Sequence, residues 1–265
     1  MVRDTNLRLR PPGLVWSSEL REAAYYHGYR GEGGEADGWL FFRNQEGVPG
    51  EIALAVGPGE GGEPWFLAVD HPGVVAEFDR ELAGPAPGRF GAAYAFENRA
   101  ELRAGITRVF HLARSVPDHP LQEFERETAH LGDTEAEQLL KRRKGQDRFR
   151  AALMDYWEAR CPLTSITEPQ LLRASHIIPW SECDSDFQRL DVHNGLLLAA
   201  HYDAAFDVGL ISFDDSGRLL MKAGLSSSLA DLLGSEQTLG QLTDKHLRNL
   251  AWHRAHFGFH QTART

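Results

Sequence analysis

The sequence contains only two cysteines, Cys161 and Cys183. Two thiols disfavour a disulfide framework and exclude a structural zinc site with four cysteine ligands. Long apolar runs are also missing, because no stretch approaches the roughly 20 residues that a membrane-spanning helix needs. The first residues lack the apolar segment of a signal peptide. We therefore expect a soluble, cytoplasmic protein with no membrane partner.

Positive charge is scarce as well. The chain has 28 Lys and Arg residues against 38 Asp and Glu residues, a formal net charge of -10. Such acidity argues against a surface that coats polyanions without selectivity. One local basic strip stands out, and it is formed by Lys141, Arg142, Arg143, Lys144, Arg148 and Arg150. On charge alone, this strip favours a solvated helix face.

The remaining composition is typical of a globular protein, and 265 residues suffice for two domains. In the first part, short apolar runs at 38–44, 50–56 and 64–70 are separated by Gly, Pro and Glu residues, a pattern that predicts strands. Residues 74–82 have helical spacing, and 92–96 predict another strand. The pattern indicates an α+β protein whose N-terminal domain mixes helices and strands.

A polar, acidic segment at 115–134 predicts the domain boundary, so we assign the domains to residues 1–120 and 121–265. Thr134 followed by Glu137 is typical of a capping box at the start of a helix. This helix leads through the basic strip.

Polar residues gather at the ends of elements in the second domain. An apolar run at 171–178 predicts a strand, and an acidic loop separates it from a second strand at 196–199. A short helix from His201 then stops at Gly209. Residues at such junctions can point outward from a rigid scaffold, so we searched there for catalytic groups.

The junctions supply a set suited to phosphodiester hydrolysis: His176, Asn194, His201 and Asp203. That reaction needs a base to activate water and a cation for the charge that develops on phosphate. A neutral imidazole can act as the base because its pKa lies near working pH. Imidazole and carboxylate ligands suit a divalent ion with open positions.

Several phrases match a known family in order. They are Arg160–Thr164 (RCPLT), Leu171–Trp180 (LLRASHIIPW) and Asn194–Gly209 (NGLLLAAHYDAAFDVG), preceded by Gly145–Arg150 (GQDRFR). Over about residues 138–225 the chain resembles HNH endonucleases of the restriction-enzyme type. The resemblance implies a ββα-metal finger with flanking helices.

The resemblance also implies roles for individual residues. His176 is expected to be the general base, and Asn194 to fix the loop around it. His201 is expected to bind a divalent metal ion, most readily Mg²⁺ or Mn²⁺, with Asp203 as second ligand. Many members carry an acid or histidine before the base, where this chain has Ser175. This departure leaves fewer protein ligands for the ion.

Other candidate residues favour structural roles. We interpret Asp207, which directly precedes Val208-Gly209, as a residue that caps or ends the helix. His253, His256 and His260 share a helical face without a carboxylate partner, so we interpret them as part of a packing helix, not a second metal site.

Together these features predict a metal-dependent endonuclease that cuts double-stranded DNA, with the basic strip contacting the DNA backbone. Cleavage of both strands by one site per chain favours a homodimer. The order of domains resembles restriction enzymes directed to modified DNA, so we assign substrate selection to residues 1–120. Aromatic residues there favour a core role over base stacking: Trp39, Phe41, Phe42, Trp65, Phe66 and Tyr94. The alternative is an inactive HNH-fold module that binds DNA or protein.

Overall fold

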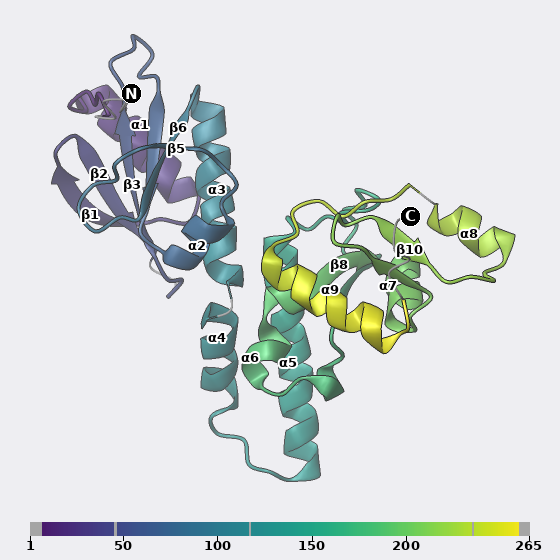
Figure 1. The fold of residues 1–265 in the computed structure, drawn as a ribbon. Coiled ribbons are helices and arrows are strands. Elements are labelled where there is room, and N and C mark those ends of the chain that lie inside the picture. Colours follow the sequence, from purple (N-terminus) through teal and green to yellow (C-terminus); the bar gives the residue numbers. More distant parts are fainter. Residues whose placement is uncertain (1–6, 45–46, 117, 235, 260–265) are drawn as a thin grey trace. The chain divides into compact units, whose positions relative to one another are not determined.

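The computed structural model describes residues 7–44, 47–116, 118–234 and 236–259 (Figure 1). The chain divides into two compact units, residues 1–119 and 120–265. Both contain helices and antiparallel sheets, so the predicted α+β class is confirmed. Among the described residues, no helix has the length and apolar character needed to cross a membrane.

The first unit is built on a six-stranded antiparallel sheet with the order β1-β2-β3-β4-β6-β5. The strands are β1 (Gly31–Ala36), β2 (Trp39–Arg43), β3 (Glu51–Val56), β4 (Trp65–Val69), β5 (Leu82–Gly84) and β6 (Ala92–Phe96). Leu40 on β2 stands opposite Leu54 on β3, which stands opposite Leu67 on β4. Strand neighbours of this kind form a continuous apolar row on one face.

Helices α1 (Leu14–Tyr26) and α3 (Arg99–Ser115) cover that face, and α2 (Pro72–Glu77) packs beside α3. Trp16 of α1 meets Trp65 edge to face, with 5.6 Å between ring centroids. α3 forms because Asn98 accepts a hydrogen bond from the backbone of Glu101 at its start, and apolar residues recur along one side. Neither α1 nor α3 was predicted from the sequence.

The opposite face of the sheet has its own core, in which Trp39, Phe66 and Phe90 pack against small alanines of β3, β4 and β6. Of the six aromatic residues whose core role was predicted, five are buried and Phe41 is half-buried. Their predicted packing role is therefore confirmed.

The second unit contains the predicted strand, strand and helix. Its elements are α4 (Asp118–Thr128), which begins at the boundary, α5 (Glu135–Tyr156), β7 (Leu172–His176), α6 (Asp186–Leu190), β8 (Gly195–Ala199), α7 (Ala200–Asp207), β9 (Ile211–Phe213), β10 (Leu219–Met221), α8 (Ser227–Leu233) and α9 (Asp244–His256). β9 and β10 pair as an antiparallel hairpin. The capping box of Thr134 and Glu137 opens α5, as predicted.

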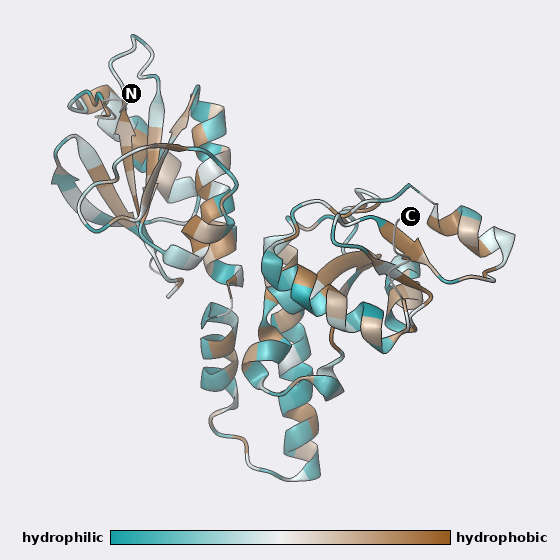
Figure 2. Cartoon of the chain, in the orientation of Figure 1, coloured by the Kyte–Doolittle hydropathy of each residue, from teal (hydrophilic) through white to brown (hydrophobic). Residues whose placement is uncertain are grey.

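Helix α5 buries one side against the β7–β8 pair, through Phe149, Leu153 and Tyr156. Figure 2 shows the contrast, with β8 brown and most of α5 teal. A helix that is polar on most of its surface and buried on a narrow stripe holds its position through those few contacts.

Helix α9 braces the finger, as the packing interpretation predicts. The ring of His253 stacks on Phe206 of α7 at 3.9 Å. Its Nε2 donates to the carbonyl of Phe206 at 3.1 Å, and its Nδ1 accepts from the Ser212 hydroxyl at 3.0 Å. Both ring nitrogens are thus engaged by protein atoms, and burial lowers the pKa of His253 to about 4. His260 lies outside the described residues.

Candidate active site

The site residues sit on a strand pair followed directly by a helix. In the antiparallel β7–β8 pair, Ser175 stands opposite Leu196 and His176 opposite Gly195. α7 begins at Ala200, immediately after β8, and packs against β7. Every residue of β8 is buried, so this strand is a rigid support for the site. The end of β7 and one side of α7 therefore lie together.

Asn194 ties down the loop that joins the two strands. Its Oδ1 accepts a hydrogen bond from the backbone N–H of Ile178 at 2.8 Å, and its Nδ2 donates to the carbonyls of Ile178 and Gln188 at 3.1 and 3.3 Å. The side chain is fully buried. Asn194 thus fixes both ends of the loop without being exposed to a substrate.

His176 has a defined tautomer. Its Nε2 lies 2.9 Å from the carbonyl oxygen of Arg189. A carbonyl oxygen can only accept, so Nε2 carries the proton and Nδ1 keeps its lone pair. Burial lowers the pKa of His176 to about 4, although the bond to Arg189 and the charge of Asp207 act in the opposite direction. At neutral pH the ring is therefore uncharged and able to accept a proton.

Two glycines allow aromatic rings to enclose His176. Phe149 of α5 stacks on the imidazole, with 3.8 Å between centroids and 16° between planes. Trp180 meets it edge to face at 5.8 Å. A Cβ on Gly195 would lie 2.4 Å from Phe149, and one on Gly145 would lie 2.4 Å from Trp180. Side chains at these positions would displace the rings that orient and desolvate the histidine.

We expect Phe149→Leu to raise the pKa of His176. A leucine covers the ring less completely, so water can stabilise the charged imidazole, and the pKa should move from near 4 toward the 6.5 of an exposed histidine. The pKa is read from the Cε1–H chemical shift of His176, followed by NMR across pH. Phe213→Leu, in a buried ring that contacts Phe206 instead, is the matched control. An unchanged pKa of His176 in Phe149→Leu would show that this ring does not control the basicity of the imidazole.

Two carboxylates of α7 lie beside the end of β7. Asp203 and Asp207 are four residues apart and share one side of the helix. Burial raises the pKa of Asp203, Ser175 and Arg173 lower it in part, and the charge of Asp207 raises it. Asp207 also acts on the pKa of His176. These groups are therefore electrostatic neighbours.

The hydroxyl of Ser175 is the odd group in this cluster. Its side chain is 3% exposed. The hydroxyl lies close enough to Asp203 to lower the pKa of that carboxyl, yet makes no hydrogen bond of ordinary geometry to any group in the described ranges. Its neighbour is therefore the Asp203 carboxylate, which places a buried hydroxyl and a partly buried carboxylate side by side.

His201 is not brought together with the other predicted site residues. It precedes Asp203 by two positions on α7, and two positions rotate a side chain by about 200°. Its ring instead packs against Tyr202, with 4.5 Å between centroids. Of the two predicted metal ligands, Asp203 thus lies beside Ser175, which precedes His176 on β7, whereas His201 projects from another side of the helix. The residue that shares the side of α7 with Asp203 is Asp207, for which the sequence predicted a role in ending the helix. The spacing of four residues between the two carboxylates is the sequence signal that could have identified it.

The basic strip is mostly engaged within the protein. Arg148 pairs with Glu127, and Arg150 donates to the carbonyls of Leu172 and Pro169 at 2.8 and 2.6 Å. Lys144 donates to the carbonyl of Glu127 at 3.4 Å, and Lys141 lies 3.7 Å from Asp133. The two exposed members without a bond to another described residue are Arg142 and Arg143. Most of the strip therefore anchors α5 within the protein, a role that the sequence did not indicate.

A hollow of about 430 Å³ lies beside the strip. Lys141 and Arg142 line it, together with Trp180, whose ring also contacts His176. The hollow thus connects the exposed arginine side of α5 with the neighbourhood of the imidazole.

A strand-borne imidazole beside two helix-borne carboxylates on a ββα frame contains the parts of a metal-assisted hydrolytic site. Residues 161–214, which carry all of these groups, match the family model described as HNH endonuclease. The C-terminal region therefore contains an HNH endonuclease domain, and the resemblance seen in the sequence is confirmed. No curated protein matches the chain. The first unit lies outside the matched residues.

Proposed function

We propose that the second unit is a metal-dependent DNA endonuclease in which His176 is the general base. The observation that carries this proposal is the tautomer of His176, whose Nε2 is held by Arg189 while Nδ1 keeps a lone pair. In this role Nδ1 takes the proton of the water that attacks phosphorus. Phe149 orients the ring, and Asn194 holds the loop that supplies the Arg189 carbonyl.

Asp203 and Asp207 are the residues proposed to hold the divalent ion. Hard ions such as Mg²⁺ bind through one or two carboxylates and complete their shell with waters and phosphate oxygens. The donor set fits this requirement, because Asp203 and Asp207 share one side of α7 beside the end of β7, and Asp203 lies next to the buried Ser175 hydroxyl. When bound, the ion stabilises negative charge on the phosphate and leaving oxygens. In the described part of the chain no group of three or more His, Cys, Asp or Glu side chains is arranged to hold a metal ion, so waters and phosphate oxygens would complete the shell around the two carboxylates.

Double-stranded DNA is the proposed substrate, and Arg142 and Arg143 are its proposed backbone contacts. Both are exposed and lie on the helix that also carries Phe149. Four of the six cations of the basic strip contact other protein groups, so affinity should depend only moderately on salt. A homodimer, with one site for each strand, is part of this proposal.

We further propose that the first unit selects the substrate, as in a restriction enzyme directed to modified DNA. It has 12 arginines, no lysine and an acidic balance, which favours recognition of bases over capture of phosphates. Residues 120–265 alone should therefore nick unmodified and base-modified DNA at similar rates, whereas the full chain should prefer one. A digestion panel of both DNAs measures this preference. If the shorter protein kept the full preference, selectivity would reside in the nuclease unit.

A further inference from the structure

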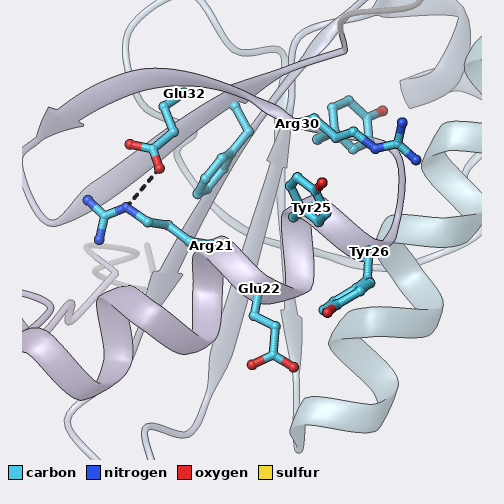
Figure 3. A pocket seen from close by; sticks show the side chains of 8 residues that line it. Arg21, Glu22, Tyr25, Tyr26, Arg30 and Glu32 are labelled. Carbon is cyan, nitrogen blue, oxygen red and sulfur yellow. Dashed lines mark ion pairs between the residues drawn. The ribbon is translucent and has the colours of Figure 1, made fainter.

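The first unit has a hollow of about 270 Å³ between its first helix and the edge of its sheet. The C-terminal half of α1 and the turn after it form one wall, and β1 and β2 form the other (Figure 3). Small-molecule pockets are commonly about 300–1,000 Å³, so this hollow suits a single compact group. It lies outside the HNH match and has no role in the chemistry proposed for the second unit.

Two tyrosines that line the hollow keep much of their surface exposed. Tyr25 and Tyr26 are 54% and 71% exposed, and their rings stand perpendicular with centroids 5.6 Å apart. Phe42 and Tyr29, each 2% exposed, form its buried floor. Elsewhere on α1, Leu20, Ala23 and Ala24 are buried. Two adjacent aromatic rings left in water are costly unless they contact something.

The charges around these rings are balanced. Arg21 pairs with Glu32 at 3.2 Å, and the guanidinium of Arg30 lies 5.6 Å from the centre of the Tyr25 ring. Figure 3 shows Tyr25 between this ion pair and Arg30, with Glu22 three residues before Tyr25 on the same helix. A free phosphate would meet two carboxylates here. A quaternary ammonium would be repelled by the positive charge of Arg30, which already lies over one face of Tyr25.

A neutral nucleobase meets neither of these obstacles. Its face is aromatic and stacks on tyrosine, and its edge carries both donors and acceptors. Arginine pairs with the acceptors of guanine, and carboxylates accept from amino groups of bases. From this complementarity we infer that the hollow binds one unstacked DNA base, with Tyr25 as its stacking platform. The choice of a base as ligand rests on the proposed nuclease function of the second unit.

The inference can be tested with two single-stranded DNA 12-mers, one normal and one abasic with the same phosphates. Binding to the full chain is measured by fluorescence anisotropy in EDTA. Wild-type protein should bind the normal strand at least about fivefold more tightly than the abasic strand. Tyr25→Ala should weaken binding of the normal strand by about 5- to 150-fold, the range for losing one stacking aromatic, and leave abasic binding unchanged. Far-UV circular dichroism verifies that the variant folds.

Leu14→Ala is the matched control, because Leu14 is an 85% exposed apolar residue of α1 outside the hollow. It should bind both strands as wild type does. Equal binding of both strands by wild type, or an unchanged affinity in Tyr25→Ala, would overturn the inference. Self-association of the protein that Tyr25→Ala abolishes would also overturn it, by assigning the tyrosines to a contact between copies. If the protein cleaved DNA but bound the normal and abasic strands equally, only the proposed base-binding role of the hollow would be refuted. If it bound the normal strand more tightly but did not cleave DNA, only the proposed nuclease function would be refuted.

Discussion

Replacing His176 by alanine is expected to lower the rate of DNA cleavage by about 10²- to 10⁴-fold, the usual contribution of a general base. The protein should still fold and bind DNA, since the loop remains held by Asn194 and the β7–β8 pairing. Single-turnover cleavage of a labelled duplex measures the rate, and a binding titration in EDTA measures the affinity.

His256→Ala provides the control for this variant, because His256 is exposed on α9 and stacks on Trp252, away from β7. Its cleavage rate should equal that of the wild type. If the His176→Ala protein cut DNA at the wild-type rate, His176 would not be the general base. A variant that neither folds nor binds would call for His176→Gln, which keeps a polar group of similar size at the same place.

Asp203→Asn and Asp207→Asn are each expected to weaken Mn²⁺ binding by about 10- to 100-fold or more, since even loss of a group that only supports a metal ligand costs that much. His201→Ala should leave Mn²⁺ affinity nearly unchanged, because its position on α7 turns it away from the two carboxylates. Isothermal titration of Mn²⁺ into the metal-free variants measures all three affinities.

Thermal unfolding without metal distinguishes ligands from structural residues. The pKa of Asp203 is raised by burial, so the folded state disfavours its charge at neutral pH. Asp203→Asn should therefore not lower the free energy of unfolding of the metal-free protein. If His201→Ala lost the metal while Asp207→Asn retained it, the ligand set predicted from the sequence would hold and the one proposed from the structure would fail.

The difference between these ligand sets reflects what a sequence pattern contains. The order of strand, loop, strand and helix follows from apolar periodicity, and the capping box of Thr134 marks the start of α5. The side of a helix on which a residue lies depends on its phase. His201 and Asp203 are close in sequence but far apart around α7, whereas Asp207 returns to the side of Asp203.

Contacts between residues far apart in the sequence also could not be predicted. The basic strip has the charge of a DNA-binding surface, yet Arg148 meets Glu127, which is 21 residues away. The exposed tyrosines of α1 were missed for a related reason. Aromatic residues in strands drew attention, but those strands lie in a two-sided core, and the unburied rings belong to a helix that the sequence analysis did not identify.

Incubation of the full-length protein with supercoiled plasmid tests the central claim most directly. With Mg²⁺ or Mn²⁺ the wild type should produce nicked and linear DNA, and excess EDTA should stop the reaction. An electrophoretic shift of the plasmid without cleavage, in the presence of either ion, would contradict the account and favour an HNH fold that only binds DNA.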